Sequence, residues 1–341
     1  MNCLIIKNFN DLINFTKLTQ NNYRTDGDIA NAKKYGYKQA TFKKALKSLE
    51  EYDQDIINGV QVKDLSGIGS GIIKRIDEIL ATGKLSEINS ENSTLHELDN
   101  LLRITGIGDS KAKKLLDDGI TLQYLLDNIG DSKLENILTH HQLLGLKYFH
   151  DFEKRIPRKE IKSLEKKLNK LVELDSKLEV IICGSYRRNL TTSGDIDVLI
   201  TRKDIKTKDD LINNNDILKK IVEFYSDNGL LIDSLTNNVT TKYMGVCKNT
   251  PKSVSRRIDI RFIPMESIYF AMLYFTGSGT FNKNMRTYAL KKGYKLNEYG
   301  LFKSNFKFNV KCENDIFDIL DLDYVNPEDR VNSYIFLDKG E

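Results

Sequence analysis

The sequence predicts a multidomain α and α+β fold, with a helical front half and a mixed back half. The chain has 341 residues, which corresponds to two or three domains of ordinary size. Apolar residues recur at helical spacing up to about residue 155, for example over residues 40–56. From residue 178 onward, segments rich in Ile and Val alternate with polar turns, a pattern typical of strands.

The elements of the back half follow in order. Pro157 marks a domain boundary, and a helix is expected over residues 160–177. Residues 265–293 predict a helix, a glycine-containing turn and a second helix. Strands are predicted, in order, at residues 178–201 (two strands around a polar loop), 242–248, 256–264 and 302–310.

Composition narrows the class of protein. Hydrophobic residues make up 40% and charged residues 29%, which is typical of a soluble globular chain. No apolar run approaches the ~18 residues of a membrane span, and the N-terminus lacks the features of a signal peptide. The four cysteines lie far apart, without zinc-ligand spacing, and predict reduced thiols. We therefore expect an intracellular protein, nuclear or cytoplasmic, without a membrane partner. Abundant Asn, Ile and Lys suit an AT-rich genome, which leaves open that the protein is a viral gene product.

The net charge of +4 is too small to indicate a polyanionic partner, but an internal repeat does indicate one. Residues 65–80 resemble residues 104–120, and each segment has Gly-Ile-Gly before a basic amphipathic helix. This is the helix-hairpin-helix pattern, in which the turn and the helix N-terminus approach a phosphate. A single copy is as often a plain interhelical turn, but two copies favour DNA-backbone binding without base recognition. The glycines are Gly67, Gly69, Gly106 and Gly108.

Two aspartates carry the strongest chemical signal. Asp195 and Asp197 are alternate residues of a predicted strand and therefore share a face. At ~4 Å, two carboxylates repel by about 4 kcal/mol at an effective dielectric of about 20, and a divalent cation removes this repulsion. Asp259, in a second predicted strand, is a candidate third ligand. Oxygen ligands suit Mg²⁺, and a two-metal site would activate an attacking oxygen and stabilise leaving pyrophosphate.

Residues upstream of the aspartates favour a phosphate site over a solvated strand edge. Gly184 and Ser185 predict a turn whose N–H groups and hydroxyl donate to phosphate. The guanidinium of Arg188 matches phosphate with paired donors. The alternative is that Arg187 and Arg188 are solvated loop residues without a ligand.

Four segments together resemble the DNA polymerase beta family, family X of the DNA polymerases, within the nucleotidyltransferase superfamily. The resemblance runs in order from about Lys38 to Arg330. The segments that carry it are GSYRRNLTTSGDIDVLI (184–200), RRIDIRFIP (256–264), YFTGSGTFNKNMR (274–286) and HHQLLGLKYFHDFEKRIPR (140–158).

The resemblance implies four domains. They are a helical lyase-type domain with the first helix-hairpin-helix (1–90), a helical DNA-binding subdomain with the second (91–155), a nucleotidyltransferase-type palm with the aspartates (156–264) and a nucleotide-selection subdomain, like a thumb or fingers (265–341).

The resemblance also implies roles for residues. Asp195, Asp197 and Asp259 would be catalytic and hold two Mg²⁺ ions, or Mn²⁺, with Asp259 as general base. Arg261 would pair with Asp197 in an open state. Residues implied to bind the incoming nucleotide are Ser185, Arg188, Gly194, Tyr274, Phe275, Gly277 and Asn282. Residues implied to contact DNA, besides the four glycines, are Lys38, Arg257 and Arg286. Carbonyls implied to hold Na⁺ or K⁺ belong to Lys63, Leu65, Ile68, Leu102, Ile104 and Ile107.

Two departures from the family pattern change what we expect. Arg75 stands where the family has the lysine that forms a Schiff base with 5′-deoxyribose phosphate, and arginine cannot form that imine. Phe42 and Gly71 also replace a tyrosine and a lysine of the phosphate pocket. We expect the lyase activity to be weak, lost or moved to Lys38, Lys74 or Lys84. Gly279 replaces an aspartate near the incoming base, which predicts low fidelity.

The function expected from these features is a monomeric, template-directed polymerase that fills short gaps in base excision repair. It would use gapped or nicked double-stranded DNA and dNTPs, with a repair ligase or endonuclease as potential partners. Two alternatives remain open: a template-independent nucleotidyltransferase, and a DNA-binding scaffold whose catalysis has decayed.

Overall fold

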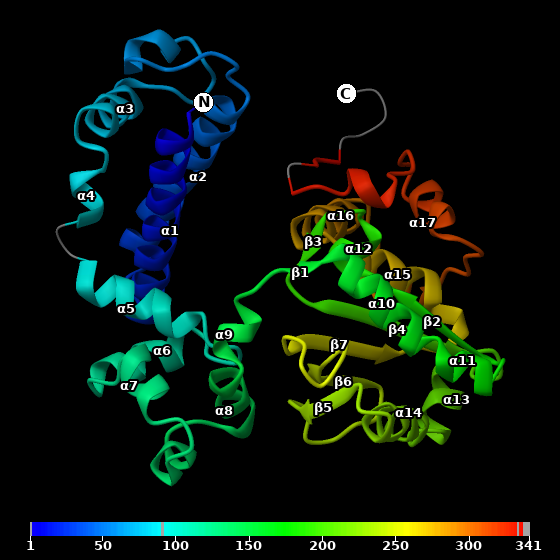
Figure 1. Ribbon diagram of the computed structural model, residues 1–341. Coiled ribbons are helices and arrows are strands. Elements are labelled where there is room, and N and C mark those ends of the chain that lie inside the picture. Colours follow the sequence, from blue (N-terminus) through cyan, green and yellow to red (C-terminus); the bar gives the residue numbers. More distant parts are fainter. Residues whose placement is uncertain (1, 90–91, 333, 337–341) are drawn as a thin grey trace. The chain divides into compact units, whose positions relative to one another are not determined.

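The computed structural model describes residues 2–89, 92–332 and 334–336, and the chain divides into two compact units between Lys147 and Tyr148 (Figure 1). The first unit is helical, and the second is built on a mixed sheet. This agrees with the multidomain α and α+β fold predicted from the sequence. Within the described ranges, every helix is too short or too polar to cross a membrane.

The first unit is built on two long helices. Helix α1 presents Ile5, Phe9 and Leu12 at helical spacing to the core, and α2 packs along it. Asp28 is the N-cap residue of α2, and its carboxylate accepts from the backbone N–H of Asn31 at 3.0 Å. The elements are α1 (Cys3–Thr25), α2 (Ile29–Glu50), η1 (Gly59–Val62), α3 (Ser70–Thr82), α4 (Ser86–Asn89), α5 (Asn92–Leu102), α6 (Asp109–Asp117), α7 (Leu122–Asp127), η2 (Ser132–Asn136) and α8 (His140–Lys147).

The two glycine turns of the repeat have the same backbone geometry. Gly67 and Gly106 adopt φ of +84° and +91°, a region that favours glycine. Gly69 and Gly108 are the extended N-cap residues of α3 and α6. Because the N-cap residue is glycine in both cases, no N-cap side chain occupies the first-turn N–H groups of either helix, and both remain suited to an anion.

The second unit contains a five-stranded sheet in the order β2–β4–β7–β6–β5. Strands β4 and β7 are parallel, and the other neighbours are antiparallel. Its elements up to β7 are α9 (Phe149–Phe152), β1 (Ile156–Pro157), α10 (Arg158–Leu168), α11 (Lys170–Leu174), β2 (Leu178–Ile182), α12 (Gly184–Arg187), β3 (Thr192–Ser193), β4 (Ile196–Arg202), α13 (Lys208–Asn213), α14 (Ile217–Asp227), β5 (Leu231–Ser234), β6 (Lys242–Cys247) and β7 (Arg256–Phe262).

The two faces of this sheet differ. Strand β7 alternates strictly, with Ile258 and Ile260 buried under α10 and α14, and with Asp259 on the opposite face. Helix α15 covers part of that opposite face, where Ala271 packs against Leu199. On that opposite face, Asp197 of β4 lies in register with Asp259 of β7.

The C-terminal part of the second unit has its own core. It packs two helices, a small antiparallel sheet and a third helix around Phe281 and Phe317, both of which are fully buried. Its elements are η3 (Met265–Ser267), α15 (Ile268–Thr276), α16 (Gly279–Lys291), β8 (Lys295–Asn297), β9 (Gly300–Lys303), β10 (Phe306–Lys307), α17 (Glu313–Ile319) and η4 (Pro327–Asp329).

Several boundaries differ from those predicted. The helix expected over residues 160–177 is interrupted at Asn169, and the one expected over 40–56 begins at Ile29 and ends at Glu50. The compact units separate ahead of Pro157, since α9 packs against β7 and the Asp151 carboxylate accepts from the N–H of Ser255 at 3.0 Å.

Candidate active site

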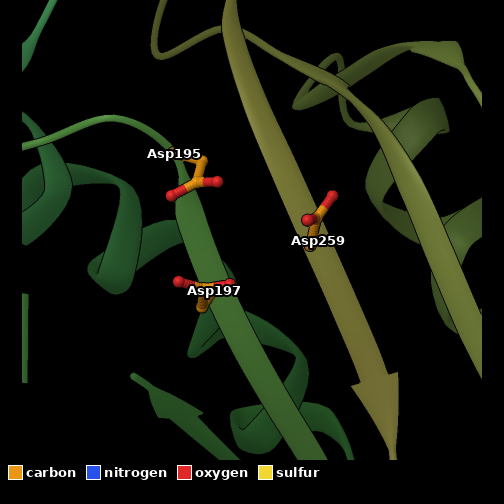
Figure 2. Close-up of side chains that lie close together, drawn as sticks. All are labelled: Asp195, Asp197 and Asp259. Atoms are coloured by element: carbon orange, nitrogen blue, oxygen red, sulfur yellow. The ribbon is translucent and has the colours of Figure 1, made fainter. Parts of the chain in front are cut away.

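Three aspartates converge at strands β4 and β7 of the five-stranded sheet. Asp195 immediately precedes β4, Asp197 lies within it, and Asp259 lies on the parallel neighbour β7, in register with Asp197. One carboxylate oxygen of each lies within 4.8 Å of the others, and Figure 2 shows the three side chains on adjacent strands. The pairing of two distant segments therefore builds the triad predicted from sequence.

Burial and mutual repulsion make this triad costly to ionise. Burial, with the Asp195 and Asp259 carboxylates, raises the pKa of Asp197 to about 7. Burial also raises the pKa of Asp259, against the lowering effect of Arg257. The Oδ1 atom of Asp259 is buried and has no hydrogen-bond partner among the residues described. Hard oxygen donors with an unpartnered member fit a divalent cation such as Mg²⁺.

An arginine contacts the triad directly. Arg257 lies two residues before Asp259, so both side chains share one face of β7, and its Nη2 donates to Asp195 Oδ2. Burial alone would lower the pKa of Arg257, but the carboxylates of Asp195 and Asp259 raise it. Arg261 instead lies over the Phe275 ring, 5.7 Å from its centroid. In the parts of the chain that are described, no ion pair joins Arg261 to Asp197, unlike the expectation for an open state.

A glycine allows the turn over residues 184–188 to approach the aspartates. Gly184 begins α12 with φ of +57°, and a Cβ there would collide with Asp197 Oδ2. The N–H of Cys183 donates to the carbonyl of Asp197 at 2.8 Å. Since Ser185 and Arg188 follow within the same turn, they are held beside the carboxylates.

A cavity of about 760 Å³ lies next to the triad. All seven residues implied to bind the nucleotide line it, together with Asp195, Asp197 and Arg286. Five further residues with side chains were not singled out from the sequence: Arg155, Leu190, Thr276, Lys283 and Thr287. Helical spacing from Asn282 and Arg286 could have identified Lys283 and Thr287, whereas Arg155 lies in the segment 140–158, which precedes all the other lining residues in sequence.

Helices α15 and α16 form the far wall of the cavity. Tyr274 and Phe275 meet edge to face, with ring centroids 5.0 Å apart. The Arg286 guanidinium lies 4.5 Å from the Tyr274 ring centroid, and Asn282 Nδ2 donates to the Tyr274 carbonyl at 2.6 Å. Gly277 has φ of +70° at the junction. These contacts fix the wall before any ligand arrives.

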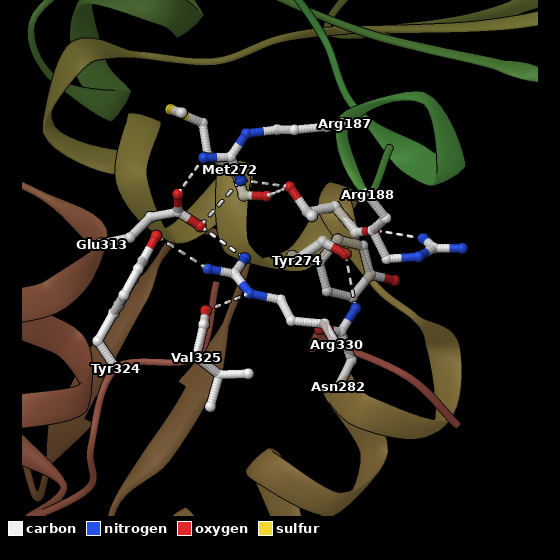
Figure 3. Close-up of polar contacts among 10 residues, drawn as sticks. Arg187, Arg188, Met272, Tyr274, Asn282, Glu313, Tyr324, Val325 and Arg330 are labelled. Carbon is white, nitrogen blue, oxygen red and sulfur yellow. Dashed lines mark hydrogen bonds and ion pairs between the residues drawn. The ribbon is translucent and has the colours of Figure 1, made fainter. Parts of the chain in front are cut away.

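A buried ion-pair network joins the turn over residues 184–188 to the C-terminal part of the second unit (Figure 3). The Glu313 carboxylate accepts from Arg187 and, at 2.8 Å, from Nη1 of Arg330, which is fully buried. Arg187 also donates to the Thr276 hydroxyl at 2.6 Å, and Arg188 donates to the Thr276 carbonyl. The turn that carries Ser185 and Arg188 is thus anchored to α15 and α17.

The first unit holds the remaining predicted residues. In each hairpin turn one N–H closes the loop, from Ile68 to Leu65 at 3.1 Å and from Ile107 to Ile104 at 3.0 Å. Residues of the two turns that were implied to offer carbonyls are Lys63, Leu65, Ile68, Leu102, Ile104 and Ile107.

The lysines proposed for lyase chemistry differ in setting from Arg75. Lys38, Lys74 and Lys84 are exposed. Arg75 instead makes a two-pronged ion pair with Glu87 and lies 5.0 Å from the Phe42 ring centroid. Position 75, where the family resemblance implied a lysine, therefore holds a paired, partly covered guanidinium.

Four family models match the chain in order. They are the helix-hairpin-helix domain (residues 23–85), the fingers domain of DNA polymerase lambda (99–153), the DNA polymerase beta palm (155–265) and the DNA polymerase beta thumb (271–331). The palm match contains all three aspartates, and the thumb match contains the far wall of the cavity.

Three curated relatives show the same likeness. DNA polymerase lambda of Arabidopsis thaliana is 29% identical over 85% of this chain and 57% of its own length. DNA polymerase lambda of Rattus norvegicus is 28% identical over 85% of this chain and 52% of its own length. DNA polymerase IV of Saccharomyces cerevisiae is 24% identical over 95% of this chain and 67% of its own length. The chain thus spans little more than half the length of the first two. The ordered matches, with the aspartate triad on its sheet, show that the chain belongs to family X of the DNA polymerases.

Proposed function

We propose that this protein is a template-directed DNA polymerase that fills short gaps in base excision repair. The observation that carries the proposal is the aspartate triad beside a cavity of about 760 Å³ with basic side chains in its wall. That volume suits a ligand of nucleotide size. The polymerase names of the relatives support the same activity.

The triad is the proposed site of the chemistry. Asp195, Asp197 and Asp259 would hold two Mg²⁺ ions, or Mn²⁺ in their place. When bound, such ions neutralise phosphate charge and favour ionisation of the attacking hydroxyl. Asp259 would accept the proton of the primer 3′-hydroxyl, because its buried Oδ1 has no hydrogen-bond partner among the described residues.

The cavity wall would hold the nucleotide by a division of roles. Ser185, Arg188 and Gly194 would contact the triphosphate, with Arg155 as an added cation at the same end. Residues proposed to contact the sugar, the base edge and the template are Tyr274, Phe275, Gly277, Asn282 and Arg286. Without a side chain at Gly279, whose neighbourhood is open, we expect weak discrimination against wrong nucleotides.

The first unit would bind the DNA backbone. The first-turn N–H groups of α3 and α6 would donate to phosphates, assisted by Lys38 and by a monovalent cation at the carbonyls of each turn. Arg257 would contact DNA once it leaves Asp195. Lyase activity is proposed to be weak or absent, since Arg75 is paired with Glu87 and cannot form an imine.

A one-nucleotide gap with a 5′-phosphate or a 5′-deoxyribose phosphate tests both activities. We expect Mg²⁺-dependent incorporation opposite the template base, abolished in Asp259→Ala, and little borohydride-trapped adduct. Equal incorporation without a template strand would favour a template-independent transferase. No incorporation by a folded, DNA-binding wild-type protein would favour a decayed scaffold.

The remaining partners follow from this substrate. We propose that the protein acts as a monomer inside the cell on gapped or nicked DNA, before a ligase and after an endonuclease. Sedimentation of the protein with and without a gapped duplex tests the stoichiometry, and a 2:1 complex would contradict it.

A further inference from the structure

A short segment packs against the helix that forms the far wall of the cavity. Residues 334–336 lie beyond residues 271–331, which the thumb family model matches. Tyr334 and Phe336 nevertheless contact α16: their ring centroids lie 5.4 and 5.0 Å from that of Phe281. Asn284 Nδ2 also donates to the Tyr334 carbonyl at 2.7 Å. We call residues 334–336 the C-terminal strap.

Helix α16 has two faces with different tasks. Phe281, Asn284 and Tyr288 follow at i, i+3 and i+7, so they share the face that meets the strap. Asn282 and Arg286 follow at i and i+4 on a second face and line the cavity. Because a helix moves as a rigid element, a shift on the strap face moves the cavity face as well.

The chain that leads to the strap is itself anchored beside the start of α16. The Arg330 carbonyl accepts from the N–H of Ser278, the N-cap residue of α16, at 3.2 Å. The Arg330 side chain is fully buried and paired with Glu313. The segment thus touches α16 at its N-cap and again along its first three turns, so it supports one side of the helix.

We propose that Tyr334 and Phe336 are positioning residues that set the placement of Asn282 and Arg286 in the cavity and thereby nucleotide discrimination. The predicted effect on nucleotide discrimination rests on the proposed polymerase function. The packing of the strap against α16 stands independently of catalysis.

Two alanine variants and a matched control test the proposal. Phe336→Ala and Tyr334→Ala remove the strap rings. Phe306→Ala removes a ring that is 63% exposed on β10 and contacts Phe308. Phe336→Leu restores apolar bulk. Hydrogen exchange of the α16 amides should accelerate in the two strap variants, remain unchanged in the control and recover in Phe336→Leu.

The functional readout separates positioning from plain stability. Below the melting temperature of every variant, KM for the correct nucleotide should rise about 3–10-fold with a smaller change in kcat, the range expected from losing one or two aromatic contacts. The preference for the correct over the incorrect nucleotide should fall in parallel. Unchanged exchange of α16, or altered exchange with unchanged KM and preference, would overturn the proposal.

Nucleotide affinity gives the same comparison without turnover. Equilibrium dialysis of a dNTP against the protein–DNA complex should show weaker binding by Phe336→Ala than by Phe306→Ala, and equal binding would overturn the role of the strap. A wild-type protein that binds dNTP without incorporating it would refute the proposed polymerase activity and leave this test intact.

Discussion

At the scale of single residues, the site depends on how closely a backbone turn approaches a carboxylate. Gly184 places α12 against Asp197, with a positive φ and no room for a Cβ. The same turn carries Ser185 and Arg188 into the cavity. Ser185, Arg188 and the carboxylates therefore line one cavity because residue 184 lacks a side chain.

Replacing this glycine should damage activity more than stability. In Gly184→Ala, the left-handed conformation costs about 1–2 kcal/mol, and the new methyl group displaces Asp197. We expect Tm to fall by about 2–8 °C and nucleotide incorporation to fall at least about 100-fold. Gly71→Ala is the control, since Gly71 lies in α3 without a positive φ. Near-normal incorporation by Gly184→Ala would show that the turn tolerates displacement.

The pKa of Asp197 makes the stability of the metal-free protein depend on pH. Because this pKa rises from its ordinary 3.8 to about 7 on folding, the folded state holds a proton that the unfolded state has lost. Stability contributed by the protonated group therefore declines as pH rises from about 4 to 7. Asp197→Asn removes this loss, so with EDTA its Tm should exceed that of the wild type at pH 8, and the gap should narrow at pH 5.

An aspartate with the opposite shift provides the control. The pKa of Asp204 is lowered: burial would raise it, but a hydrogen bond from Lys177 and the charge of Arg202 outweigh that effect. Asp204→Asn should therefore leave Tm unchanged or lower it slightly at pH 8. A Tm gain of the same size in both variants would show that the effect is not specific to the triad.

Sequence reasoning identified the acidic residues of the site and missed how the basic ones are engaged. Asp195 and Asp197 are local in sequence, so strand alternation alone places them together. Arg257 meets Asp195 across 62 positions, and that contact depends on the register of β4 with β7. Arg261 lies on Phe275 because α15 returns over the sheet, which no local pattern reveals.

At the scale of elements, an ion pair joins α3 to α4 at position 75, where the family resemblance implied a reactive lysine. Gly83 ends α3 in the left-handed conformation, as a helix C-cap glycine does, and the turn brings Glu87 of α4 to Arg75. The pair also explains why a simple reversion should fail. A lysine at position 75 would face the Glu87 carboxylate, which favours the protonated, non-nucleophilic amine.

A double substitution should therefore restore more imine chemistry than a single one. We expect borohydride trapping on 5′-deoxyribose phosphate DNA to be weak in Arg75→Lys and about tenfold faster in Arg75→Lys/Glu87→Gln, since removing one neighbouring charge shifts a lysine pKa by about one unit. Glu87→Gln alone is the control and should match the wild type. Equal trapping by the single and double variants would exclude control by Glu87.

Element boundaries were harder to predict than element types. The helix over residues 160–177 has continuous periodicity, yet the chain turns at Asn169 so that Leu171 can join the core beneath the sheet. Strand β5 covers only Leu231–Ser234; it is too short to show alternation and is stabilised by pairing with β6. Tertiary contacts decided both cases.

At the scale of the whole molecule, the two units carry different candidate sites. The first unit carries two exposed N-cap glycines, Gly69 and Gly108, and the second carries the triad and the cavity. The hairpins were predictable because each is a local motif repeated within one chain.

The two hairpins permit a substitution that separates DNA affinity from folding. A Cβ at Gly69 or Gly108 meets no atom within 4 Å, and φ is negative at both. Aspartate is a favourable N-cap residue, so Gly69→Asp and Gly108→Asp should preserve or raise Tm. The new carboxylate nevertheless stands where a phosphate would bind, and serine at the same positions is a neutral N-cap control.

Salt dependence of binding to a gapped duplex then counts the lost phosphate contacts. The slope of log K against log salt is negative. Its magnitude should fall by about 0.9, the value for one phosphate, in each aspartate variant and by about 1.8 in the double variant. The serine variants should retain the wild-type slope. If the slope of the double variant equals that of either single variant, the two hairpins do not bind the same duplex at once. Unchanged slopes in all variants would mean that neither hairpin contacts phosphate.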